Sequence, residues 1–420
     1  MAGDVASERA VRRHSAGRTR PPQHVMPTRL TRYILAEIMK IFVVALIALT
    51  LLILLIGVGR TLLREGLGPL AIVKLLPFVL PISLQFAFPA TALFAVSCVY
   101  GRMAGDGEVA TVKASGISPL KILQPAFVFA FLLSPFAVYM SDLAVSWGRP
   151  GVNRVVMLSI EDIVYRKMRS QLSYTDERFS IHVQGVDGKR LEYPTVTVHS
   201  GGTPMKLQAR EGRLTLDVEN ETLLLELTDS RWDRGGSIQG IVPGKTEVPI
   251  PLSRTLRTPS LEETRPSELP LSLIQHERLS QDARSHAAVG ELAAHTGFSI
   301  LTSRTEEIAG AAGQHKFAQL EQSKKRLTRL RIEPWRRWAE GFSCFFFVFI
   351  GAPLAMIARA SDYWTTFGRC FLPTLLLYYP LFILGLNQAK DAVIPPYGVW
   401  LGNVALGAIG VVLVNRVRRY

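Results

Sequence analysis

Residues 41–59 read IFVVALIALTLLILLIGVG and contain no charged side chain. An α-helix needs roughly 20 apolar residues to cross the hydrocarbon core of a bilayer, because each residue adds only about 1.5 Å of length. The run is too long for the apolar part of a signal peptide, and no small-residue cleavage site follows it. It therefore predicts a transmembrane helix that remains in the protein.

Five further uncharged runs continue this pattern, at residues 75–101, 122–141, 341–358, 370–389 and 392–414. Apolar residues make up 48% of the 420-residue chain, yet its formal net charge is +14, and the basic residues lie between the runs. This separation excludes a uniformly soluble enzyme and a disordered protein. We expect an α-helical integral membrane protein with six transmembrane helices, three within residues 29–145 and three within residues 335–420.

Lys and Arg are concentrated in short segments on one side of the predicted bundle. These segments are the N-terminal flank, the loop between spans two and three, the loop between spans four and five, and the C-terminal residues. Since Lys and Arg of short loops stay in the cytoplasm, both termini are predicted to be cytoplasmic. Basic residues 1–28 are expected to form a disordered tail at the membrane surface. The long segment between spans three and four then lies outside.

This outside segment divides into two parts. Residues 146–257 are expected to form a β domain, in which short alternating strands with turn signals run from about Gln171 to Leu252, most clearly a hairpin from Leu214 to Leu227. This pattern predicts a small antiparallel β sandwich or jelly roll. A passive domain is one alternative, and an apolar sheet face that holds an acyl chain or adds strands to a partner sheet is the other. Residues 258–334 are polar and helical, and their Ala- and Gly-rich middle at 287–313 predicts poor order.

The sequence predicts no catalytic centre, metal site or cofactor. Cys98, Cys344 and Cys370 lie inside predicted spans as small apolar filler, and the eight histidines lack metal-ligand spacing. Residues 240–246 resemble the end of a phosphate loop, but only three residues separate the glycines and no helix is expected to follow. If ATP drives this protein, another chain must hydrolyse it.

Two other classes of membrane protein fit the sequence less well. An intramembrane enzyme would need ionisable catalytic residues inside its spans, and the six uncharged runs have none. A membrane-bound sensor would normally carry a cytoplasmic signalling domain, whereas only tails are predicted on that side. A permease without catalysis of its own is the class we expect.

The loop between spans two and three is the most informative connection. Residues 108–114 predict a short helix, ended by Gly116, with Glu108 and Val112 on one face. A surface-parallel helix with an apolar stripe and one carboxylate suits docking to a soluble partner, and a plain interfacial connector is the alternative.

On the outer side, seven cations precede span four and form either a solvated face or a site for an anionic ligand: Lys324, Lys325, Arg326, Arg329, Arg331, Arg336 and Arg337.

The chain resembles the LptF/LptG family, the permease subunits of the lipopolysaccharide-export ABC transporter. The similar positions cover about residues 29–166 and 330–420: Arg32-Tyr33, Glu37, Lys40, Gly107-Glu108, Val112, Ala114-Ser115-Gly116, Ser118, Gly351-Ala-Pro353-Leu354, Leu376-Leu-Tyr-Tyr379, Pro395-Pro396, Trp400 and Asn403. The chain departs from the family at Ala339-Glu340-Gly341, where a proline is usual, and residues 270–325 look like an insertion.

The resemblance implies a multi-pass permease subunit of the bacterial inner membrane, with its β domain in the periplasm. It implies pairing with a second related permease as a heterodimer, a cytoplasmic ATPase dimer below, and periplasmic bridge proteins that receive the lipid. Lipopolysaccharide would enter between spans one and five. Nucleic acid is not expected as a partner.

Two sets of site residues accompany the resemblance. Lipopolysaccharide is expected to meet a cationic rim at the outer interface, unless these side chains only anchor the protein to lipid headgroups: Arg60, Arg64, Arg336 and Arg337. ATPase docking is expected on a coupling helix near residues 103–116, through Glu108, Val109, Val112 and Gly116.

Overall fold

The computed structural model describes residues 28–65, 69–175, 179–198, 205–217, 222–234, 238–251, 264–304, 306–358 and 363–419. The predicted basic tail, apart from its last residue, lies outside the described residues.

Six helices of the described chain are long and apolar enough to cross a membrane, which confirms the six-span prediction. They are formed by α2 (Thr28–Glu65), α3 (Pro69–Gly105), α5 (Pro119–Leu143), α10 (Ala311–Ala358), α11 (Tyr363–Lys390) and α12 (Leu401–Arg419). α10 lies at the centre, where it packs against α3, α5, α11 and α12. α2 packs mainly against α3 and leaves Val44, Leu51 and Leu55 exposed.

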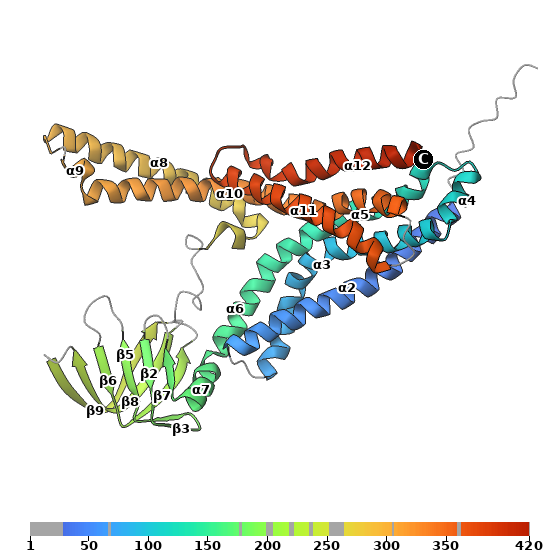
Figure 1. Cartoon of the computed structure of the whole chain (residues 1–420). Helices are drawn as coiled ribbons and strands as arrows, with labels where there is room; N and C mark the ends of the chain where they lie inside the picture. Colours follow the sequence, from blue (N-terminus) through green and yellow to red (C-terminus); the bar gives the residue numbers. More distant parts are fainter. Residues whose placement is uncertain are drawn as a thin grey trace, which may run out of the picture.

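The two ends of the helix bundle carry different structures (Figure 1). At one end, α4 (Glu108–Ala114) joins α3 to α5 and lies near the end of α12. At the other end, the chain forms a β domain and a long helical hairpin. The extra-membrane parts predicted to lie outside therefore share one end of the molecule.

The chain leaves the third span as helix. α5 continues through a π-helical turn (Ala144–Gly148) into α6 (Arg149–Leu158) and α7 (Ile160–Gln171). Gly148 permits this path, because a Cβ there would lie only 2.8 Å from the carbonyl oxygen of Phe78 on α3. The predicted β domain of residues 146–257 thus begins with helices, and its first strand starts at Ser173, close to the expected start near Gln171.

The nine described strands form one antiparallel sheet. They are β1 (Ser173–Thr175), β2 (Phe179–His182), β3 (Gly185–Asp187), β4 (Arg190–Glu192), β5 (Thr195–Val198), β6 (Met205–Gln208), β7 (Glu211–Asp217), β8 (Thr222–Arg234) and β9 (Ile238–Pro251). The order is β1-β2-β5-β6-β8-β7-β4-β3, and β9 pairs with β8 along the other edge of β8. The predicted hairpin is confirmed, with Leu214 opposite Leu225. Residues 240–246, which resemble a phosphate loop in sequence, lie in β9.

One face of the sheet is closed by α7. Alternate strand residues such as Ile181 and Leu225 point to the same side of the pleat and are buried with Val164 and Met168 of α7. The Tyr165 hydroxyl donates to the Lys189 carbonyl oxygen at 2.8 Å and accepts from the Leu214 backbone N–H at 2.8 Å. These two bonds fix α7 to the β3–β4 turn and to β7.

The helical hairpin consists of α8 (Leu271–Leu301), α9 (Glu306–Ala309) and the first half of α10. We expected poor order across residues 287–313. This expectation is wrong for the part that lies in α8, because α8 is a continuous helix to Leu301. The two helices meet through polar contacts. Gln281 Nε2 donates to Ser323 Oγ at 2.7 Å, and Arg326 pairs with Glu277 at 3.1 Å. Apolar side chains add to this interface, since Ile274 of α8 and Leu330 of α10 are buried in one small cluster.

Candidate functional site

The predicted docking helix is present as α4, with the predicted bounds Glu108–Ala114. Gly107, with φ 74°, precedes the helix, and Gly116, with φ 80°, ends it. Both conformations are left-handed, which glycine adopts without a Cβ clash. The two glycines therefore isolate about two helical turns between α3 and α5.

The two valines of α4 face the bundle and not the solvent. Val109 is 8% exposed, and Val112 packs against the same buried cluster. The apolar stripe that we expected to meet a partner is therefore used to seat α4 on the protein. The exposed side of α4 consists of small residues, Ala110, Thr111 and Ala114.

Glu108 lies at the border between the buried and exposed sides of α4 and is partly exposed. It forms no hydrogen bond or ion pair with any residue that the structure describes. A nearby carboxylate, Glu37 of α2, is instead paired with Arg102 of α3 at 3.2 Å and with Lys40 at 3.2 Å. At this end of the bundle, Glu108 within α4 and the more exposed Asp106 just before it are thus both available to a cation from outside the chain.

The outer end of the bundle contains a buried ion-pair cluster that the sequence did not predict. Arg337 is 0% exposed, and its Nη1 lies 2.7 Å from Asp142 Oδ1 at the end of α5. Its Nε lies 3.1 Å from Glu333 Oε1, and its Nη2 donates to the carbonyl oxygens of Ser267 and Leu269. Every nitrogen of this guanidinium therefore has an acceptor within the chain.

Asp142 completes this arrangement. Its Oδ1 also accepts a hydrogen bond at 2.8 Å from the backbone N–H of Leu271, the first residue of α8. Arg337 and Asp142 together hold the start of α8 against the ends of two membrane spans. The expectation that Arg337 contacts lipopolysaccharide does not fit this enclosed position.

Arg336 is also paired within the chain. Its Nε lies 2.9 Å from Glu333 Oε2, and its Nη1 pairs with Glu340. The guanidinium keeps only limited exposure, at 20% of the side chain. Arg60 and Arg64 lie in the last turns of α2, and their side chains fall outside the described part of the structure. Of the four predicted rim cations, the structure thus describes the side chains of Arg336 and Arg337 alone, and both are paired with carboxylates.

Sequence reasoning missed Asp142 and Glu333, although a signal was present. Asp142 follows directly after the uncharged run 122–141, and Glu333 precedes the pair Arg336 and Arg337 by about one helical turn. A carboxylate at such a boundary pairs more readily with a nearby guanidinium than with water.

Among the described residues, no group of three or more His, Cys, Asp or Glu side chains could hold a metal ion.

Comparison with known protein families finds a match. The model of the family described as "Lipopolysaccharide export system permease LptF/LptG" matches residues 32–416. That range includes the six spans, α4, the β domain and the helical hairpin. A search of curated proteins finds no match to the chain.

Proposed function

Because the chain belongs to the LptF/LptG family of lipopolysaccharide export permeases, we propose that it extracts lipopolysaccharide from the inner membrane and passes it to a periplasmic bridge. ATP hydrolysis in a separate subunit drives this transfer. The family match carries the proposal, since it extends from residue 32 to residue 416. The chain is the permease of the transporter and not its ATPase.

The partner arrangement follows from the two ends of the bundle. The end with α4 and the C-terminus lies in the cytoplasm, on an ATPase dimer, because the short basic segments are on that side. A second, related permease packs beside this chain. The exposed apolar faces of α2 and α11, with Leu51, Leu55, Leu376 and Ile383, support this packing and a lateral opening between the two permeases.

Energy coupling is assigned to α4. Its buried valines make it one body with the ends of α3 and α5, so a push on α4 is transmitted to two membrane spans. Glu108 supplies a carboxylate for an Arg or Lys of the ATPase, and a charge-assisted contact of this kind contributes about 1.5–3 kcal/mol.

Lipid contact is assigned to Arg60 and Arg64 at the outer end of α2. Arg336 and Arg337 take a different role, because both are paired with carboxylates. They shape the outer end of the bundle from within and hold the helical hairpin in place.

The proposal is tested by purification from native membranes followed by ATPase assays with lipopolysaccharide in nanodiscs. A second permease and an ATPase should co-purify with the chain, and lipopolysaccharide should stimulate hydrolysis.

Glu108→Lys should weaken ATPase docking about tenfold to a hundredfold, whereas Asp106→Asn, just outside α4, should leave it unchanged. A charge reversal on the ATPase should restore part of the loss.

Two outcomes would contradict the proposal in different ways. Purification of the chain without any ATPase would remove the transporter function itself. Full stimulation of ATP hydrolysis by lipopolysaccharide in Glu108→Lys would leave the transport function in place, but it would show that Glu108 is an ordinary solvated side chain.

A further inference from the structure

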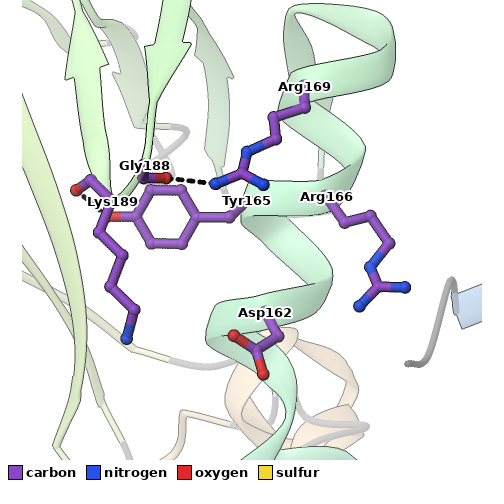
Figure 2. Close-up of a pocket in the computed structure, with 6 residues that line it drawn as sticks. All are labelled: Asp162, Tyr165, Arg166, Arg169, Gly188 and Lys189. Atoms are coloured by element: carbon purple, nitrogen blue, oxygen red, sulfur yellow. Dashed lines mark hydrogen bonds between the residues drawn. The ribbon is translucent and has the colours of Figure 1, made fainter. Parts of the chain in front are cut away.

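A pocket of about 350 Å³ lies between α7 and the turn that joins β3 to β4 (Figure 2). It is separate from both α4 and the Arg337 cluster. Its lining combines three cations, one carboxylate, one aromatic ring and one glycine: Arg166, Arg169, Lys189, Asp162, Tyr165 and Gly188.

The frame of the pocket is held in one geometry. The Tyr165 hydroxyl is fixed by the Lys189 carbonyl oxygen and the Leu214 N–H, both at 2.8 Å. Arg169 Nη2 donates to the Gly188 carbonyl oxygen at 2.6 Å, across the mouth of the β3–β4 turn (Figure 2). Gly188 has φ 58°, the left-handed conformation that keeps this turn tight. The frame of the site is therefore preformed, and a ligand would order mainly the exposed Arg166 side chain.

The cations of the pocket retain unused hydrogen-bond donors. Arg166 has no partner among the described residues, and Arg169 has only the Gly188 carbonyl oxygen. Lys189 pairs with Glu161 at 2.6 Å, and this contact raises the pKa of Lys189, so its amine stays charged. Arg166 and Arg169 project from neighbouring turns of α7, the spacing at which two helical side chains can meet the same ligand.

The position of the pocket decides what can reach it. Ile163, on the same helix, is buried with Leu75 and Val155 in a cluster at the outer end of α3. Leu75 begins the second uncharged run, so α7 lies at the outer boundary of the membrane. Headgroups of the outer leaflet and soluble anions both have access to this level.

We propose that the pocket between α7 and the β3–β4 turn binds a phosphate monoester. Its terminal oxygens suit the free donors of Arg166 and Arg169, because each guanidinium offers a planar pair of donors to a tetrahedral anion, and Lys189 adds positive charge beside them. A phosphate monoester carries about −1.5 to −2 charge at pH 7, whereas a carboxylate carries −1, so the phosphate suits two guanidinium groups better. Asp162, about one turn before Arg166, also lines the pocket, and its carboxylate can accept a hydrogen bond from a hydroxyl group of the esterified alcohol.

The site does not depend on the proposed transport function. Its test needs neither an ATPase nor a second permease, so a failure here leaves that function untouched. The phosphate could belong to a lipid headgroup or to a soluble compound, and both sources share the same chemistry.

The test uses the full chain in phosphatidylcholine nanodiscs, titrated with inorganic phosphate by isothermal calorimetry. Arg166→Gln with Arg169→Gln should weaken phosphate binding about tenfold or more. The matched control, Arg154→Gln with Lys167→Gln, also removes two exposed cations of the same region. Neither control residue lines the pocket, and Lys167 lies over the Tyr174 ring, 5.4 Å from its centroid. The control should bind phosphate within about twofold of the unaltered chain.

A second arm identifies the source of the phosphate. If phosphatidic acid in the nanodisc abolishes the heat of phosphate binding, the pocket takes a lipid headgroup, and if the heat persists it takes a soluble ester. Absence of binding at millimolar phosphate in both kinds of nanodisc would overturn the proposal. An equal loss in the control pair would also overturn it, because that result would reflect general charge attraction and not this pocket.

Discussion

Arg337 is a charged side chain that the protein encloses completely at the edge of the membrane. A buried charge is tolerated only when its donors are satisfied, since its desolvation costs several kcal/mol. Here two carboxylates and two carbonyl oxygens supply the acceptors. The acceptors come from positions 195, 70, 68 and 4 residues away in the chain, so the pairing could not be derived from local sequence.

Arg337→Met tests this cluster. The substitution leaves Asp142 without its cation and removes one of the two guanidinium partners of Glu333, and the expected loss of stability is about 3–5 kcal/mol. Arg329→Met on the same helix is exposed and should change stability by less than about 0.5 kcal/mol. Thermal unfolding and protease sensitivity near residues 266–271 measure the effect. Equal unfolding temperatures of the two variants would show that the cluster does not hold the hairpin.

Tyr165 provides a pH-dependent test of the contact between α7 and the sheet. Burial raises the pKa of Tyr165 above its ordinary value of 10.0, because the charged phenolate is poorly solvated there. The folded state therefore keeps the proton longer than the unfolded state, and its stability falls as pH rises above 10. Tyr165→Phe should cost about 1–3 kcal/mol at neutral pH, since the Leu214 N–H loses its acceptor.

The same variant should flatten the alkaline limb of the stability curve, measured by thermal unfolding between pH 8 and pH 11. Tyr193→Phe is the control, because that ring is exposed. A steep alkaline limb that survives in Tyr165→Phe would have to come from other groups.

At the scale of elements, apolar runs and strand alternation carried most of the prediction. The spans and the β7–β8 hairpin follow from periodicity alone, because burial in lipid or in a sheet imposes it directly. The helices α6 and α7 were missed, since their path depends on the close approach of Gly148 to α3. The valines of α4 lie on the predicted helix, but they pack against the bundle and not against a partner. A short apolar stripe does not reveal which of these two surfaces it meets.

A pair of glycine substitutions separates packing from helix propensity. Gly148→Ala places a Cβ 2.8 Å from the Phe78 carbonyl oxygen and should destabilise the chain by about 1–3 kcal/mol. Gly290→Ala in the middle of α8 meets no atom within 4 Å and should stabilise it by about 0.5–1 kcal/mol. Thermal unfolding should therefore shift in opposite directions. Shifts of the same sign would contradict the described path of α6 along α3.

At the scale of the whole molecule, the two ends of the bundle must lie on opposite sides of the membrane. Single cysteines at Asp187 and Glu321 should react with an impermeant maleimide in spheroplasts, whereas one at Asp106 should react only after permeabilisation. All three positions are exposed, and the native cysteines Cys98, Cys344 and Cys370 are buried, so background labelling should be low. Labelling of position 106 in intact spheroplasts would reverse the topology and remove α4 from the cytoplasm.

α10 is one continuous helix from Ala311 to Ala358, and it contributes to both the hairpin and the membrane bundle. About 24 of its residues precede the span, which corresponds to roughly 36 Å of rod outside the membrane. Such a rod is a lever arm. A tilt of the span by about 10° displaces the hairpin tip by roughly 6 Å, whereas the Arg337 cluster, close to the fulcrum, barely moves. A change in the tilt of the fourth span therefore produces a larger displacement at the far end of the hairpin.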